Sequence, residues 1–141
     1  MSDPLYRKEL LRLAADAHGA GRLDSPHMTG MAYNPACGDR VIVDITLSNG
    51  SVVGFAHETR ACVLAQASAS VLAANLEGAD LASVEQLRAC VVDMLEGGAA
   101  PSPPFDRYSV FDGTVEYKSR HSCVLLPIDA VLDALNKIEA R

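Results

Sequence analysis

The stretch from residue 40 to residue 57 constrains the fold more than any other part of the chain. Between Arg40 and Leu47, apolar residues occupy every second position, which is typical of a strand with one buried face. Asn49-Gly50 follows, and because both residues tolerate a positive φ, this pair is the strongest short signal for a hairpin turn. Residues 51–57 then form the return strand. We therefore predict an antiparallel hairpin at the centre of the fold.

The segments around this hairpin predict a third strand and four helices. Residues 28–33 add one short strand, and 105–119 contains a turn at Phe111-Asp112-Gly113. One helix is expected at 5–18, with Asp3-Pro4 as its cap, and a second at 61–76. A third begins at a capping box of Ser83 and Gln86 and ends at Gly97, and a fourth runs from Pro127 to Ile138. A small sheet needs a helical layer over one face. The fold class is therefore α+β: a small antiparallel three-stranded sheet covered by helices, in a single domain over residues 1–141.

The chain is acidic, with a formal net charge of −6 and a pI of about 5.1. Nucleic-acid binding and polybasic membrane anchoring both require a basic surface, so this charge argues against both. The first residues lack the apolar stretch of a secretory signal, and no segment approaches the roughly 18 apolar residues of a membrane span. We expect a cytoplasmic protein with no nucleic-acid and no membrane partner.

The chemistry of the chain is concentrated in four widely spaced cysteines: Cys37, Cys62, Cys90 and Cys123. A reducing cytoplasm disfavours disulfides, and no two of the four form a C-x-x-C pair. Cys90 lies in a helical pattern, three or four residues from apolar neighbours, and is predicted to be an inert core cysteine packed under its helix.

Cys37 lies in a tight turn formed by Pro35 and Gly38, directly before the strand that begins at Arg40. Gly38 lets the backbone fold so that Cys37 and Asp39 can face the same side. A thiolate and a carboxylate two residues apart can then bind one cation, with Asp39 exposed on the turn. The alternative is a solvent-exposed turn with an incidental cysteine.

Cys62 lies at the start of a predicted helix, immediately after the return strand. Free backbone N–H groups and the helix dipole lower the pKa of a thiol at this position, and Arg60 can add positive charge. The alternative is a small buried residue that caps the helix.

Cys123 lies just ahead of the helix predicted to begin at Pro127. Arg120 could stabilise a thiolate here, and His121 is a possible metal ligand. The alternative is a core cysteine, which the apolar residues 124–126 support. The other histidines have no partner in the sequence and are expected to be surface or structural residues.

No phosphate-binding loop, nucleophile elbow, zinc-protease motif or calcium loop is present in the sequence. Three cysteines and one aspartate at the ends of elements are therefore the available chemical constellation. Three sulfurs favour zinc or iron–sulfur chemistry over magnesium or calcium.

Three motifs in chain order resemble the iron–sulfur cluster assembly scaffold family that contains the N-terminal domain of NifU, IscU and SufU. Residues 31–39, Met-Ala-Tyr-Asn-Pro-Ala-Cys-Gly-Asp, are similar to the cysteine loop of the family. Residues 61–70 resemble its second cysteine and the small-residue helix that follows, and residues 120–127 resemble the block with the third cysteine. The resemblance covers nearly the whole chain.

This resemblance implies that Cys37, Asp39, Cys62 and Cys123 converge at one exposed end as the metal and cofactor site. It implies a cluster built from iron and from persulfide sulfur that a cysteine desulfurase delivers, with acceptor apo-proteins as recipients. The implied cofactor is zinc or a 2Fe-2S cluster, and Cys123 is the implied sulfur acceptor.

One position departs from the IscU branch, where a histidine directly precedes the third cysteine. Here that position is Ser122, and His121 lies one residue earlier. The long Pro-containing segment between Cys62 and Cys123 is more similar to the SufU branch, whose members hold zinc and accept sulfur. A zinc-dependent persulfide acceptor is therefore an alternative to a true scaffold. The rival classes are a purely structural zinc domain and a cysteine-nucleophile enzyme that uses Cys62 or Cys123 with His121.

Overall fold

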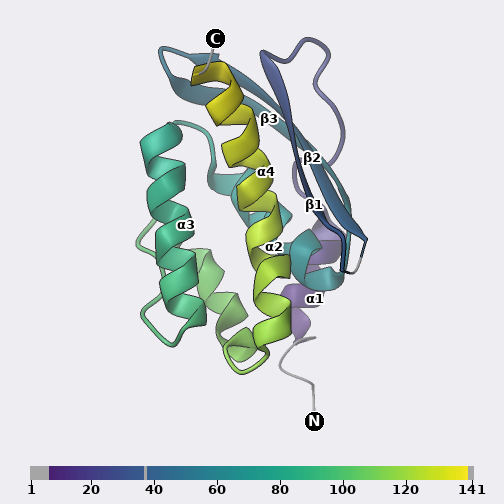
Figure 1. The fold of residues 1–141 in the computed structure, drawn as a ribbon, viewed down its shortest axis with the longest axis vertical. Coiled ribbons are helices and arrows are strands. Elements are labelled where there is room, and N and C mark those ends of the chain that lie inside the picture. Colours follow the sequence, from purple (N-terminus) through teal and green to yellow (C-terminus); the bar gives the residue numbers. More distant parts are fainter. Residues whose placement is uncertain (1–6, 37, 140–141) are drawn as a thin grey trace.

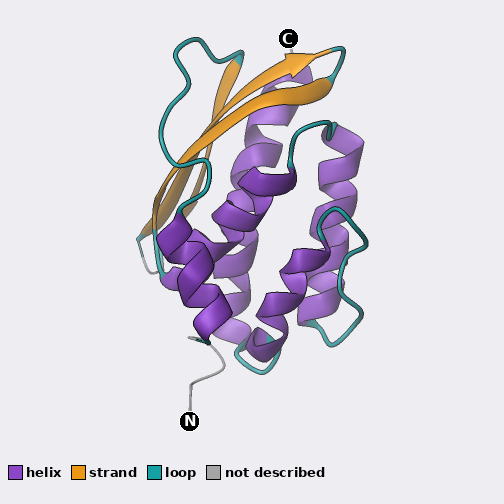
Figure 2. Ribbon diagram, turned by 180° about the vertical axis from the view of Figure 1, so that it is seen from behind, coloured by secondary structure: helices purple, strands orange, loops and turns teal. Residues whose placement is uncertain are grey.

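The sheet runs along one side of the molecule and the helices pack beside it (Figures 1 and 2). The structure is a computed structural model that describes residues 7–36 and 38–139. Its elements in chain order are α1 (Lys8–Asp16), β1 (Met28–Asn34), β2 (Asp39–Ser48), β3 (Ser51–Arg60), α2 (Val63–Asn75), α3 (Leu81–Leu95), η2 (Asp106–Thr114), η3 (Lys118–Arg120) and α4 (His121–Glu139). The predicted α+β fold with a three-stranded antiparallel sheet is confirmed. None of the helices in this described part combines the length and apolar character needed to cross a bilayer.

The strands pair antiparallel in the order β1-β2-β3. Asn49 and Gly50 have φ values of 54° and 81°, so the hairpin turn lies where the sequence predicts it. Val41, Val43 and Ile45 are completely buried on the face that meets the helices. The alternating pattern therefore determines which face of β2 belongs to the core.

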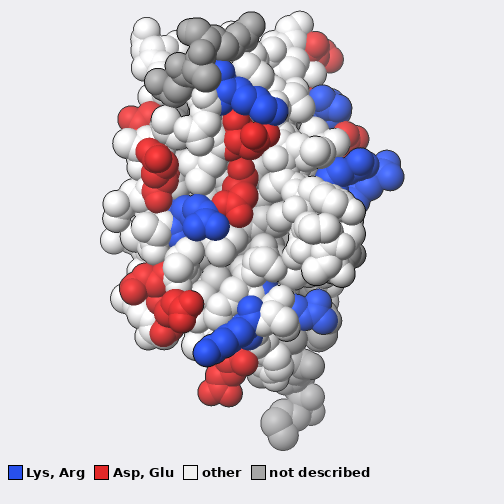
Figure 3. Space-filling view, in the orientation of Figure 1, with Lys and Arg blue, Asp and Glu red and all other residues white. Residues whose placement is uncertain are grey.

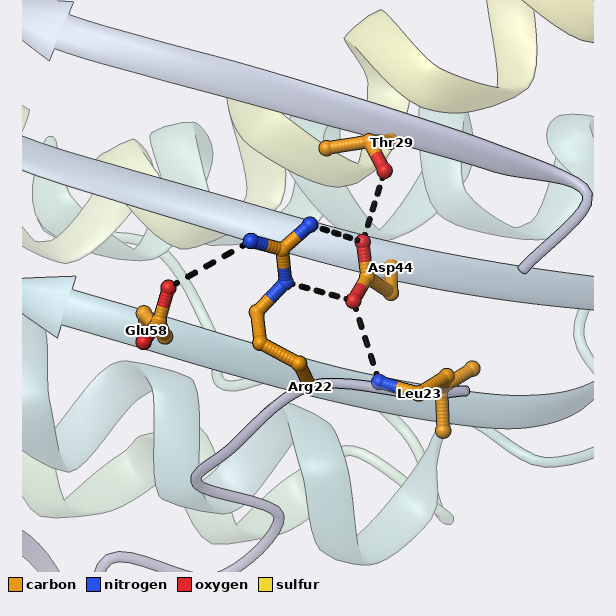
Figure 4. A network of polar contacts seen from close by, with 5 residues as sticks. All are labelled: Arg22, Leu23, Thr29, Asp44 and Glu58. Atoms are coloured by element: carbon orange, nitrogen blue, oxygen red, sulfur yellow. Dashed lines mark hydrogen bonds and ion pairs between the residues drawn. The ribbon is translucent and has the colours of Figure 1, made fainter. Parts of the chain in front are cut away.

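The opposite face of the sheet, here called the outer face, is partly covered by the loop between α1 and β1. Asp44 of β2 is only 1% exposed there, under this loop. Its carboxylate accepts hydrogen bonds from Arg22 at 2.6 and 3.0 Å, from the Thr29 hydroxyl at 2.6 Å and from the Leu23 backbone N–H at 3.0 Å (Figure 4). The Arg22 guanidinium in particular lowers the pKa of Asp44 to about 2. This network fastens the loop to the sheet.

The last helix differs from its prediction, because α4 begins at His121 rather than at Pro127. Pro127 lies inside the helix, where it has no N–H to donate to the carbonyl four residues earlier. The helix continues through the preceding residues because Val124 and Leu126 are buried, and because the Ser68 hydroxyl donates to the Val124 carbonyl at 2.6 Å. Cys123 therefore lies in the first turn of α4 and not ahead of it.

The prediction of a capping box at Ser83 and Gln86 is also wrong. The N-cap of α3 is Asp80, and its carboxylate accepts hydrogen bonds from the backbone N–H and the hydroxyl of Ser83, each at 2.8 Å. Aspartate and serine are comparably good N-caps, so the earlier residue starts the helix.

The helix predicted at 5–18 is shorter in the structure. α1 ends where Ala17 takes a left-handed conformation with φ 48°, ahead of Gly19. The predicted cap at Asp3-Pro4 lies outside the described residues.

The predicted turn at 111–113 is part of the 3₁₀ helix η2. Tyr108 and Phe111 of this helix are completely buried, with ring centroids 5.6 Å apart. These two aromatic side chains anchor the segment to the core, which the local turn residues did not indicate.

Candidate metal centre

Three of the four predicted ligands lie together in the structure. One ligand atom each from Asp39, Cys62 and Cys123 lies within 4.8 Å of the other two. They come from the first residue of β2, the N-cap of α2 and the first turn of α4. Cys37, the fourth predicted ligand, lies outside the described residues.

Asp39 reaches the site because of strand alternation. It lies two residues before the buried Val41, so its side chain is on the same face of β2 as the core, while Arg40 is on the outer face. The residue is half-buried and belongs to the strand, so its prediction as an exposed turn residue is corrected.

Cys62 has the geometry of an activated thiol. Its pKa is lowered to about 6, first by a hydrogen bond with Cys123 and then by the backbone N–H groups of Ala65 and Leu64 at the start of α2. Partial burial and the negative charge of Asp39 act in the opposite direction. The helix start thus contributes as the sequence predicts, but the largest effect comes from a thiol 61 positions away in the chain.

Cys123 is 4% exposed and packs with the core at the start of α4. Its Sγ lies 4.0 Å from Oδ2 of Asp39. The residue therefore combines the two interpretations that the sequence left open, because it is both a core cysteine and a member of the polar group.

The turn between β1 and β2 is held by hydrogen bonds that Asn34 accepts. Its carbonyl accepts from the Gly38 N–H at 2.8 Å, and its side-chain oxygen accepts from the Ala36 N–H at 3.1 Å. Gly38 has φ 76°, a conformation that favours glycine. Asn34 Nδ2 also donates to the hydroxyl of Ser122 at 3.2 Å, next to Cys123. The sequence analysis missed this contact, since its partners are 88 residues apart.

His121 is not part of the cluster of Asp39, Cys62 and Cys123. Its Nε2 lies 3.1 Å from the carbonyl oxygens of Thr114 and Val115, so the ring is oriented towards the end of η2. This hydrogen bonding is a structural role, and it gives no support to His121 as the base of a cysteine-nucleophile enzyme.

Cys90 and His57 lie outside the cluster as predicted, but the burial of Cys90 differs from its prediction. Cys90 is half-buried rather than packed in the core, and Gln86 Nε2 donates to its sulfur at 3.5 Å. His57 is 1% exposed and bonds to the Thr59 hydroxyl and the His18 carbonyl, each at 2.9 Å, which is a structural role.

The described donor set consists of two thiols and one carboxylate. Thiolates prefer zinc and iron–sulfur species, and three protein donors in this arrangement leave one position of a tetrahedral site open. The group can therefore hold a metal ion, and its sulfur-rich character fits the metals that the sequence indicates.

The sequence of this chain is similar to those of known proteins. Residues 5–124 match the family profile described as the NifU-like N terminal domain. The chain is 24% identical over 134 residues to the iron–sulfur cluster assembly scaffold protein IscU of Thermotoga maritima, covering 95% of this chain and 94% of that one. It is 25% identical over 138 residues to the zinc-dependent sulfurtransferase SufU of Bacillus subtilis, covering 97% and 93%.

The same fold occurs in solved structures. The N-terminal part of a nitrogen-fixing NifU-like protein from Brucella abortus superposes with a TM-score of 0.93 at 36% identity, covering 99% of this chain and 97% of that one. A SufU-type scaffold candidate from Fervidobacterium islandicum superposes with a TM-score of 0.85 at 21% identity, covering 96% and 99%.

Proposed function

The chain belongs to the NifU-like N-terminal domain family, and from that premise we propose that it is an iron–sulfur cluster assembly scaffold. Cys37, Asp39, Cys62 and Cys123 bind iron or zinc and receive sulfur from a cysteine desulfurase. A cluster, or its sulfur, then passes to acceptor apo-proteins. The observation that carries the proposal is the convergence of ligand atoms from Asp39, Cys62 and Cys123 within 4.8 Å of one another.

The donor set suits release as well as binding. We assign the fourth ligand position to Cys37, whose neighbours Ala36 and Gly38 are both bonded to Asn34. Asp39 is the one hard oxygen donor among soft sulfurs, so its bond is the one most easily exchanged. An exchangeable ligand distinguishes a site that passes on its cargo from one that stores it.

We assign sulfur acceptance to Cys123, which lies 4.0 Å from the exchangeable Asp39 carboxylate. Its thiolate attacks the terminal sulfur of the donor's persulfide, and a new S–S bond forms as the donor's S–S bond breaks. The donor cysteine leaves as a thiolate, so no external oxidant or reductant is required. A metal held by these cysteines would keep them deprotonated at neutral pH. Cys123 is only 4% exposed, so the incoming persulfide reaches it after a neighbouring group moves, and we assign that movement to Asp39.

A zinc-dependent persulfide acceptor is the second candidate function. Ser122 occupies the position where the IscU branch has a histidine, and its hydroxyl bonds Asn34 instead of offering a nitrogen ligand. The Bacillus subtilis relative is named as a zinc-dependent sulfurtransferase. We therefore expect freshly isolated protein to hold zinc rather than a cluster.

Elemental analysis before and after incubation with iron, cysteine and a cysteine desulfurase tests these functions. We expect about one zinc per chain at first, because the donor set is that of a tetrahedral zinc site. Equal amounts of iron and sulfide afterwards would identify a scaffold, whereas retained zinc with a persulfide on Cys123 would identify a sulfur acceptor. Retained zinc with neither product would contradict both and leave a structural zinc domain.

Cys90→Ala is the matched control for this experiment. Cys90 is a half-buried cysteine of the same chain that lies outside the metal-binding group. The variant should take up metal and sulfur as the unchanged protein does, whereas Cys62→Ala should lose both.

A further inference from the structure

The outer face of the sheet has an open part next to the metal centre. The loop that Arg22 and Asp44 fasten is held to this face at Asp44, in the middle of β2. Beyond it, towards Asp39, the pairing register places Tyr33, Arg40 and Arg60 side by side on the three strands. Strand alternation puts all three on the outer face, because the residues next to Arg40 in β2 face inwards.

We call Met31, Tyr33, Arg40, Ile42 and Arg60 the outer-face patch. Met31 pairs with Ile42 one step along the sheet from the Tyr33–Arg40 pair, so the five side chains are contiguous. Met31 and Tyr33 are 49% and 56% exposed, and both are large apolar side chains. Arg60 is exposed and Arg40 is half-buried.

The position of the two arginines in this patch does not favour folding. Arg40 and Arg60 are directly opposite each other in the β2–β3 pair, and like charges in that position destabilise a sheet. Within residues 7–36 and 38–139 the structure records no ion pair for either of them. Glu58, on the same face, pairs with Arg22 at 3.6 Å.

This unpaired positive charge stands out on an acidic protein. The chain carries 18 acidic and 12 basic residues, and on the helical face of the molecule the two kinds are interspersed (Figure 3). A surface with two adjacent uncompensated arginines and exposed Tyr and Met side chains has the composition of a protein-binding site for an acidic partner.

The patch lies at the same end of the sheet as the metal centre, on the opposite face. Arg40 directly follows Asp39, and Arg60 lies two residues before Cys62, so a protein seated on the patch reaches the metal centre around this end of the sheet. We propose that the outer-face patch docks an acidic segment of the protein that delivers sulfur to this site. The inference rests on the proposed function, because it names the partner surface of the same site.

Charge reversal tests the inference. The probe is the cysteine desulfurase of the same organism, titrated against the full chain in a sulfur-transfer assay with cysteine. We expect Arg40→Glu with Arg60→Glu to raise the KM for the desulfurase about tenfold or more and to remove most of its salt dependence, with kcat within about twofold. Arg12→Glu with Arg107→Glu is the matched control, since both arginines are exposed on the helical side and the net charge changes equally.

A neutral pair of substitutions guards against a folding defect. Arg40→Gln with Arg60→Gln removes the repulsion between the two strands, so its melting temperature should equal or exceed that of the unchanged protein while its KM still rises. An unchanged KM in both double variants would overturn the inference. A dimer of the unchanged protein that dissociates in the charge-reversal variant, measured by sedimentation, would also overturn it by making a second copy the occupant.

A small-molecule persulfide separates this inference from the proposed function. Such a donor needs no docking surface, so it should load sulfur equally onto the unchanged protein and both arginine variants. Failure to load the unchanged protein would contradict the proposed function and the inference with it. Equal loading by the small donor, together with equal desulfurase kinetics, would contradict the docking surface alone.

Discussion

The side chain of Asn34 ties together two parts of the chain that carry candidate ligands. Its oxygen accepts from the Ala36 N–H within the turn, and its nitrogen donates to Ser122 in the first turn of α4. Ser122 therefore positions the turn against the helix that carries Cys123, a role that its sequence neighbours do not reveal. This contact gives Ser122 a role in the candidate site although its side chain offers no nitrogen ligand.

Breaking this contact should weaken metal binding as well as folding. Asn34→Ala removes both side-chain hydrogen bonds, each of which is worth about 1 kcal/mol, so we expect metal to bind at least fivefold more weakly. Ser122→Ala removes only one of the bonds and should have a smaller effect. Zinc affinity measured by competition with a chelator, alongside melting temperatures of the metal-free proteins, checks this. Equal zinc affinity in all three proteins would mean that the bond has no positioning role.

At the scale of elements, the approach of α4 to β1 determines where two ligands meet. β1 leads into the turn before Asp39, and the first turn of α4 carries Cys123. Gly30 lies where the helix crosses the strand, and a Cβ there would lie 2.6 Å from the Ala134 nitrogen and would also collide with the Ala130 carbonyl oxygen. Because Gly30 has no side chain, the backbone of α4 can pack directly against β1 at this point.

Gly30→Ala should consequently affect both stability and the site. The backbone of α4 has to move to admit the methyl group, and overpacking of this kind costs about 1–3 kcal/mol. The shift also changes the separation of Asp39 and Cys123, so zinc affinity should fall in protein that remains folded. Gly54→Ala is the control, because its Cβ would meet its nearest neighbour at 3.3 Å, on a side chain of β2. Equal zinc affinity in the two folded variants would show that the crossing does not position the ligands.

The sheet and most helices could be predicted because their signals are local. The alternation around Val43 and the Asn49-Gly50 turn each depend on adjacent residues, and both predictions are confirmed. The start of α4 could not be predicted in this way. Pro127 is a strong local signal for a helix start, but the buried contact of Ser68 with the Val124 carbonyl keeps the preceding turn helical. Tertiary packing overrode a local preference there.

At the scale of the whole molecule, some features of the candidate site could be predicted from the sequence and others could not. The chemistry of Cys62 at a helix start is local and was predictable, whereas its hydrogen bond with Cys123 depends on the complete fold. The outer face of the sheet also contains a feature that the sequence could not predict. Asp44 in the middle of an apolar strand indicated nothing by itself, because its partner Arg22 lies in a loop 22 residues away.

The network around Asp44 predicts how the whole fold responds to acid. The pKa of Asp44 is lowered from 3.8 to about 2 in the folded chain, so the folded state favours the ionised carboxylate. Its contribution to the free energy of unfolding is complete above about pH 4 and is lost as the pH falls towards 2. We therefore expect stability to decline over that range as the loop that Arg22 fastens is released.

Asp44→Asn should remove this part of the pH dependence and lower stability at neutral pH by about 1–3 kcal/mol, since Arg22 loses its buried partner. Urea unfolding at about pH 2.5, 4 and 7 measures both effects. Glu58→Gln is the matched control, because Glu58 also pairs with Arg22 but has a 49% exposed side chain. That variant should keep the acid-dependent decline, since the Asp44 contacts with Arg22, Thr29 and Leu23 all remain. If both variants declined in acid as steeply as the unchanged protein, the acid sensitivity would have to arise from other carboxylates and the loop would not depend on Asp44.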